Sequence, residues 1–492
     1  MARTLEANAQ YLKRTLSHYS DAVFRELAVG PSGFKTMIIY LSGIADIQVI
    51  NEQIIKTIMQ AGLGGNKHVL TPGILKEQFL QTTALPVEIE TGDFLSQCVL
   101  EMMSGNTCWL IDGLDEALII KTGKFPSRNV EEPSTETLAR GPRQGFIEDI
   151  GSNLAMIRNY IKDVSLQIDN YHVGTRSLRQ LAVVYIADIA NPELVQDIQK
   201  RIQSIDIDDV PDTGVVEQLI EETSWSPFPQ LQATERCDIA VSALMGGRVV
   251  IMLDGTPFVL IAPMTFWMLA QSPEDYYERF PLGTFFRLLR LAAMFLATFL
   301  PSLYISLVSF HPGLIPPEMI MSIVASRQGV PFPVLIEALI MEVSLEILRE
   351  ASLRLPKGIG QVIGIVGGLV IGQAAIEASI VSSFMVIVVG LTAISSFASP
   401  QYSGSIGIRL LRFPIMLAAS IYGLYGVMLS FIFLGAHMVR LKSFGVSYMA
   451  PLAPIRFRDL QDALVRIPYK QLKRRSLTLK TQDETMSDRK RK

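Results

Sequence analysis

The chain has 492 residues, of which 49% are apolar and 18% charged, and its formal net charge is −3. This length exceeds one ordinary domain, and the charge gives no support for a nucleic-acid-binding protein. The three cysteines and five histidines show neither metal-ligand spacing nor a disulfide framework, so we predict no metal and no other cofactor.

The N-terminus is polar and charged. It lacks the apolar stretch of a cleavable signal peptide, so we expect the N-terminal half to stay in the cytoplasm. Within residues 1–30, the spacing of Leu12, Leu16, Val23 and Leu27 predicts one polar helix that forms a peripheral arm.

The next part of the chain alternates short apolar runs with amphipathic segments, which predicts an α/β fold. It contains a weak internal repeat, and each copy ends in a hairpin whose turn is Asp-Gly, at Asp112 and at Asp254. We predict two similar α/β subdomains over 31–120 and 146–270. The segment 121–145 between them is rich in proline, glycine and charge, as is typical of a linker.

A short helix is predicted after the α/β region, with Ser272 as its N-cap and Pro273 as its first residue. Aromatic and basic side chains follow, as is typical where a chain reaches the cytoplasmic face of a bilayer. The residues of this predicted collar are Tyr276, Tyr277, Arg279, Arg287 and Arg290.

Four apolar segments within 271–440 predict an α-helical membrane domain with about four spans. They are Leu291–Phe310, Gly358–Ile376, roughly Ser382–Ala398, and Phe413–Met438. An even number of spans places both termini on one side, and the basic tail over 441–492 agrees with a cytoplasmic side. Attraction to anionic lipid headgroups explains this tail more simply than nucleic-acid binding does.

The segment Phe332–Leu355 is helix-like but too charged to face lipid, so it is predicted to be either interfacial or re-entrant. Glu342, Glu346 and Glu350 share one face of this helix at four-residue spacing. The stripe is either a solvated face or the wall of a vestibule that concentrates cations. Glu350 is also placed to pair with Arg354.

Glycines recur at every fourth residue of the second predicted span, which gives that helix one smooth face for close packing. These helix-packing glycines are Gly360, Gly364, Gly368 and Gly372. The face serves either packing within one subunit or self-association into a ring. In a ring, the pore-lining or gate candidates are Val362, Val366, Leu369, Gln373 and Glu377.

Glu377 has two interpretations of its own. It is either an interfacial residue at a helix hairpin or one member of a ring of carboxylates that attracts cations. Because no strong turn signal surrounds it, the sequence does not fix its depth.

Motifs of catalysis are weak. Asp254-Gly255-Thr256 lacks the preceding aspartate of a phosphatase motif, and Gly62–Lys67 lacks the Ser/Thr and the spacing of a phosphate-binding loop. Signatures of Ser/His/Asp or Cys/His catalysis are also missing from the sequence. We therefore predict that the chain is not an enzyme.

Several short strings occur in the order that one known family shows. They include 234–238 (TERCD), 253–257 (LDGTP), 272–277 (SPEDYY), 300–304 (LPSLY) and 364–368 (GIVGG). In these strings, and over most of its length, the chain resembles the A subunit of the GerA-type spore germination receptors of endospore-forming bacteria. The resemblance is weakest in 121–145 and in the basic tail.

The resemblance implies a subunit of a nutrient-responsive receptor in the inner membrane of the spore. It implies two partners, a transporter-like B subunit that holds the nutrient and a lipoprotein C subunit. The A subunit is implied to oligomerise into a nutrient-gated cation channel and to have no catalytic residues. The alternatives are a non-conducting scaffold that transmits a signal and a solute transporter, although the four spans show no inverted repeat.

Overall fold

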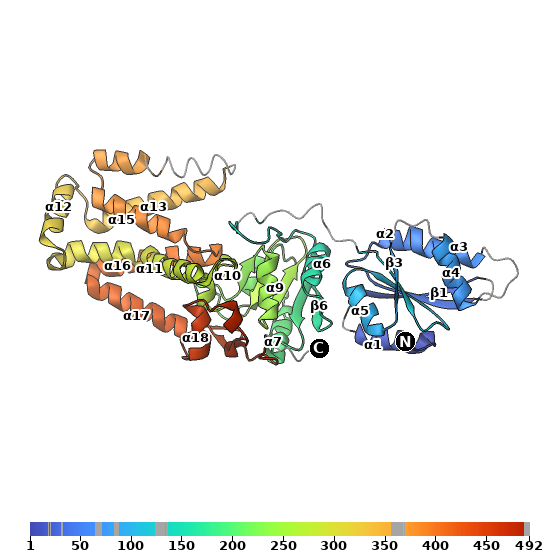
Figure 1. Ribbon diagram of the computed structural model, residues 1–492. Coiled ribbons are helices and arrows are strands. Elements are labelled where there is room, and N and C mark those ends of the chain that lie inside the picture. The colour runs from blue at the N-terminus through green and yellow to red at the C-terminus, as the bar shows by residue number, and fades with distance from the viewer. Residues whose placement is uncertain are drawn as a thin grey trace.

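The computed structural model describes residues 1–17, 19, 21–30, 33–63, 71–82, 88–123, 133, 136–355, 368 and 370–486. It contains two α/β units, here the first unit (residues 1–123) and the second unit (136–278), followed by a helical bundle (280–440). The two units and the bundle lie in a row, and the C-terminal segment returns from the bundle to the second unit (Figure 1).

The first unit is a five-stranded antiparallel sheet covered by helices on both faces. Its elements are α1 (Leu5–Thr15), β1 (Ala22–Val29), β2 (Phe34–Leu41), α2 (Ile47–Val49), the π-helix η1 (Ile50–Ile55), α3 (Lys56–Leu63), α4 (Pro72–Thr82), β3 (Ile89–Gly92), α5 (Leu95–Met103), β4 (Thr107–Ile111) and β5 (Ala117–Ile120). The strand order is β1-β2-β4-β5-β3. Apolar residues of α1 and α5 cover one face, and those of η1, α3 and α4 cover the other.

The second unit repeats this architecture. Its elements are α6 (Ile150–Tyr160), β6 (Leu166–Val173), β7 (Arg179–Ile186), α7 (Pro192–Gln203), α8 (Thr213–Ile220), β8 (Gln232–Thr234), α9 (Cys237–Met245), β9 (Val249–Leu253), β10 (Val259–Ala262), η2 (Phe266–Leu269) and α10 (Glu274–Tyr277). The strand order is β6-β7-β9-β10-β8. Helices α6 and α9 pack on one face of the sheet, and α7 and α8 pack on the other.

The equal strand orders confirm the two similar α/β folds that the internal repeat predicts. The predicted hairpins are β4–β5 and β9–β10. In their turns, Gly113 and Gly255 have φ of 89° and 91°, a conformation that glycine adopts without the steric cost of a Cβ. The Asp-Gly signal was therefore read correctly in both copies.

The single polar helix predicted over residues 1–30 is wrong. The helix α1 ends at Thr15, and β1 then pairs with β2 along its whole length. Helix α1 is also no peripheral arm, because Leu5, Ala9 and Leu12 lie in the core of the first unit.

The bundle contains α11 (Phe280–Phe310), η3 (Pro312–Leu314), α12 (Pro317–Arg327), α13 (Val334–Leu353), α15 (Ser383–Ser396), α16 (Tyr402–Tyr422) and α17 (Leu424–Arg440), and residues 370–377 are also helical. Among the described residues, two helices are long and apolar enough to span a membrane, Phe280–Phe310 and Gly404–Tyr422. Two shorter apolar helices are Ser383–Phe397 and Leu424–Arg440.

The predicted fourth span, Phe413–Met438, is wrong because two helices share this sequence. Gly423 separates α16 from α17 with φ 60° and ψ −140°, a conformation open to glycine. Helix α17 then folds back, so that a Cβ added at Gly426 would lie 2.2 Å from the carbonyl oxygen of Ala418. Of the other predicted spans, Leu291–Phe310 lies within α11, and most of Gly358–Ile376 lies outside the described residues.

The C-terminal segment folds onto the second unit. It contains the short strands β11 (Lys442–Ser443) and β12 (Val446–Ser447), helix α18 (Phe457–Ala463), and the turns η4 (Tyr469–Gln471) and η5 (Leu477–Leu479). Arg475 is 9% exposed, and its Nε donates to the carbonyl oxygen of Met245 at 2.8 Å. The charge of Arg475 is therefore bonded inside the protein, in contrast to the role at lipid headgroups that the sequence predicts for the tail.

Candidate functional site at the base of the helical bundle

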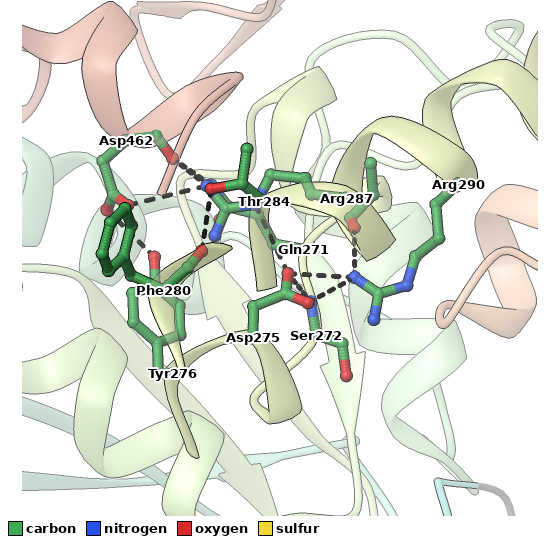
Figure 2. A network of polar contacts seen from close by, with 10 residues as sticks. Gln271, Ser272, Asp275, Tyr276, Phe280, Thr284, Arg287, Arg290 and Asp462 are labelled. Atoms are coloured by element: carbon green, nitrogen blue, oxygen red, sulfur yellow. Dashed lines mark hydrogen bonds and ion pairs between the residues drawn. The ribbon is translucent and has the colours of Figure 1, made fainter. Parts of the chain in front are cut away.

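A buried carboxylate joins the second unit to the first helix of the bundle. Asp275 of α10 has no exposed surface, and Arg290 of α11 places Nη1 2.7 and 2.9 Å from its two oxygens. Arg287, one turn earlier on α11, donates from Nε at 3.3 Å (Figure 2). Two guanidinium groups thus compensate one buried carboxylate, and loss of the carboxylate would leave buried positive charge unpaired.

This contact of α10 with α11, here called the junction, also includes helix α18 of the C-terminal segment. The hydroxyl of Tyr276 donates to Oδ2 of Asp462 at 2.9 Å, and Arg287 lies 3.6 Å from Oδ1 of Asp462 (Figure 2). Burial raises the pKa of the Asp462 carboxyl, and the adjacent Arg287 opposes this rise. Movement of α10, α11 or α18 therefore disturbs one shared set of charges.

The N-terminal segment of the second unit reaches this junction. This strap, residues 136–146, is held by Arg236, whose Nη1 and Nη2 donate to the carbonyl oxygens of Glu136 at 3.1 Å and Pro142 at 2.7 Å. The backbone N–H of Ala139 donates to Glu274 of α10 at 2.6 Å. Strap and α10 are thus linked by a direct hydrogen bond.

Helix α9 forms a second link to α10. The hydroxyl of Tyr277 donates to Oδ2 of Asp238 at 2.5 Å, and the Arg236 guanidinium bonds the same carboxylate at 3.0 Å. Asp238 and Arg236 are almost fully buried, so this pair is a fixed part of the structure. The contacts form a continuous path from the strap, through α9 and α10, to α11.

The structure corrects two predictions here. The helix begins at Glu274, and Ser272 makes no side-chain cap; its backbone N–H instead donates to Asp275 at 3.3 Å. Of the predicted membrane-facing collar, Arg287 and Arg290 turn into the protein, while Arg279 is exposed.

The carboxylate stripe of α13 runs from a buried residue, Glu342, through the half-buried Glu346 to the exposed Glu350. Glu342 is 1% exposed and is paired with Arg412 of α16. Glu346 lies 3.0 Å from Arg349 and 3.8 Å from Arg409. The solvated-face interpretation is therefore wrong for Glu342, and ion pairs tie α13 to α16.

At the end of the stripe, the predicted pair is confirmed. Arg354 donates to Glu350 at 2.7 Å, and both side chains are exposed. Such an exposed pair contributes little to stability.

The predicted gate lies largely outside the described residues. Val362, Val366 and Leu369, and the glycines Gly360 and Gly364, have no described structure. Gln373 and Glu377 are exposed on the helix 370–377, and Nε2 of Gln373 donates to Oε1 of Glu377 at 3.2 Å. Gly372 is buried and a Cβ there would meet Val386 of α15 at 3.4 Å, whereas a Cβ at Gly368 would meet nothing within 4 Å.

The candidate site consists of paired charges that link separate elements of the chain. Within the described ranges, no group of three or more His, Cys, Asp or Glu side chains is placed to hold a metal ion. The junction instead connects the strap, the second unit, the tail and α11 through buried charges.

Comparison with known proteins gives consistent matches over nearly the whole chain. The profile of the family described as Bacillus/Clostridium GerA spore germination protein matches residues 10–478. The chain is 40% identical over 481 residues to the spore germination protein GerLA of Bacillus cereus, covering 98% of this chain and 96% of that protein. It is 39% identical over 471 residues to the uncharacterized membrane protein YfkQ of Bacillus subtilis (strain 168), covering 96% and 90%.

One solved structure is also similar. It is the crystal structure of the N-terminal domain of the A subunit of the Bacillus megaterium spore germinant receptor GerK3. The identity is 30% and the TM-score 0.42, and the match covers 54% of this chain and 97% of that one.

Proposed function

The chain belongs to the GerA family of spore germination receptor A subunits, and we propose that it forms a nutrient-gated cation channel in the inner membrane of the spore. In this proposal several copies form a ring, and a transporter-like B subunit and a lipoprotein C subunit complete the receptor. Both termini lie on the cytoplasmic side.

The observation that carries the channel is the exposure of the helix 370–377. Gly372 packs against α15, but Gln373 and Glu377 lie exposed on the helix and bond to each other. An amide beside a carboxylate in an apolar domain needs water or another protein surface, because lipid satisfies neither group. A ring of copies that places this face on a water-filled axis meets that need.

The junction supplies the connection from signal to bundle. Asp275 holds α11 through two arginines, and the strap and α9 hold α10. A partner that shifts the second unit therefore pulls on α11 directly. Because α11 packs against α13, α15, α16 and α17, its displacement changes the whole bundle.

The test is conductance of the purified three-subunit receptor in planar bilayers, with and without nutrient. We expect a nutrient-dependent cation current, and we expect Glu377→Gln to lower cation over anion selectivity. The matched control is Ile387→Ala on α15, whose side chain is 65% exposed and uncharged. Absence of current in every oligomeric state would contradict the channel.

A non-conducting scaffold is the second candidate, and one observation favours it. The charged side chains between α13 and α16 pair with one another, as in Glu342–Arg412 and Glu346–Arg409, and so do not offer free carboxylates to a passing ion. A receptor that responds to nutrient by a change in subunit distances, yet never conducts, would support the scaffold.

A further inference from the structure

A loop of the second unit carries an aromatic side chain with no cover. The segment 221–230 lies between α8 and β8, and its Trp225 is 96% exposed. Among the described residues, this is the largest exposed fraction of any large apolar side chain. An indole combines a large apolar surface with one N–H donor. A fully exposed indole therefore gains none of the stabilisation that burial of its apolar surface would give.

The rest of the loop is seated firmly on the membrane helices. Phe228 is 2% exposed and packs in one cluster with Met294 of α11 and Ile408 of α16. Oγ of Ser226 lies 3.0 Å from Nε2 of His437 on α17. A Cβ added at Gly407 of α16 would lie 2.2 Å from the carbonyl oxygen of Pro227, so loop and helix are in direct backbone contact.

These contacts fix the depth of the loop relative to the apolar part of the bundle. Met294, which packs with Phe228, lies inside the uncharged segment Leu291–Phe310. Leu410 follows the contact residue Gly407 on α16, and Phe433 precedes the contact residue His437 on α17. These two side chains are 63% and 77% exposed. The loop therefore lies beside exposed apolar surface of the bundle.

Positively charged side chains near the loop are also consistent with a lipid surface at this level. Arg440, at the end of α17, and Lys442, two residues later, are exposed close to His437 in the chain. Basic residues at this end of a span are attracted to anionic headgroups. Tryptophan is itself enriched at the boundary between hydrocarbon and water.

We propose that the loop 221–230 is a membrane anchor of the second unit, with the Trp225 side chain inserted among the lipid headgroups. The anchor fixes the height of the second unit on the bilayer, so that movement of this unit is directed along the membrane. It goes beyond the channel proposal and requires that the bundle lies in a bilayer.

The test uses tryptophan fluorescence of the full-length chain in phosphatidylcholine vesicles. The chain has three tryptophans, so the emission of Trp225 is the difference between wild type and Trp225→Phe. We expect this difference to lose most of its intensity in vesicles whose lipids carry bromine near the headgroup, and to change little with aqueous iodide. Because Trp225 is exposed, Trp225→Phe leaves the fold intact.

Two results would overturn the anchor. Quenching by iodide without quenching by brominated lipid would place Trp225 in water. Resistance to both quenchers would mean that protein covers it, either a second copy or another subunit. A reporter, Phe433→Trp in the Trp225→Phe background, separates this failure from failure of the membrane assignment, because it must be quenched by bromine deeper in the acyl chain.

Discussion

The two α/β units have the same strand order but different roles for the helix that follows their third strand in the sequence. In the second unit, α9 holds other parts of the chain: Asp238 accepts from Tyr277, and the Met245 carbonyl accepts from Arg475. In the first unit, α5 leaves Leu100 53% exposed, and Phe94 immediately before it is 68% exposed. The same fold therefore occurs in the second unit, which forms the base on which the bundle rests, and in the first unit, whose helix α5 has an exposed apolar face.

The first unit meets the second through a small set of contacts. Arg158 of α6 pairs with Asp21 in the turn before β1, and the Tyr19 hydroxyl donates to the carbonyl oxygen of Asp163 at 3.1 Å. The units therefore differ in what their helices contact. The second unit is bonded to α11 through Asp275, whereas Phe94 and Leu100 of the first unit leave apolar surface exposed.

The largest expected difference between the two units comes from removing the carboxylate of Asp275 at the junction. We expect Asp275→Ala to destabilise the protein by about 3–5 kcal/mol, because two arginines lose their shared carboxylate and the buried Arg287 keeps only its longer ion pair, with Asp462. Thermal unfolding in detergent measures the loss. The matched control in the first unit is Asp115→Ala, whose partner Arg3 is exposed and 3.8 Å away, and which should cost under about 0.5 kcal/mol. Equal losses of stability in the two variants would show that the junction does not stabilise the contact between the second unit and α11.

A backbone contact offers a second test of the base. Gly407→Ala places a methyl group against the Pro227 carbonyl, and the loop must move, at a cost of about 1–3 kcal/mol. The control is Gly435→Ala on α17, where a Cβ meets nothing within 4 Å and the helix gains roughly 0.5–1 kcal/mol. Unfolding midpoints of the two variants should therefore shift in opposite directions. A shift in the same direction would mean that the loop adapts freely.

The sequence was most informative where its signals are local. The Asp-Gly turns predicted both hairpins, since turn chemistry depends on adjacent residues. Strand β1 was missed because it is an edge strand whose exposed Arg25 and Glu26 resemble a polar helix face. The break at Gly423 was missed because the apolar composition continues through it, and one glycine among many gives no signal.

The junction shows the limit of local patterns. The arginines of α11 were noticed in the sequence, but arginines near a span usually face lipid headgroups. Their inward direction depends on Asp275 and on Asp462, which is distant in the chain and lies in a segment whose net charge is strongly basic. Arg412 was missed for a similar reason, because its partner Glu342 belongs to another helix. Only the tertiary structure brings such groups together.

The strap gives a prediction that depends on pH. Burial raises the pKa of Glu136 from 4.5 to about 7, and the hydrogen bond from Thr234 opposes this rise. The folded state therefore binds the proton more tightly than the unfolded state, and stability from this group falls as pH rises from about 4.5 to 7. We expect the unfolding temperature of wild type, relative to Glu136→Gln, to fall across this window and then level off. A constant difference would show that the strap does not bury the carboxyl.

The smallest effect should come from the free face of the first unit. Leu100→Ser replaces a side chain that is 53% exposed, so we expect the unfolding free energy of the isolated chain to change by less than about 0.5 kcal/mol. The same change should matter in the assembled receptor if a partner covers α5, which co-purification of the three subunits measures. A loss above about 1 kcal/mol in the isolated chain would mean that another part of the chain already covers α5. The two units would then differ less than their contacts indicate, because both helices would hold neighbouring segments.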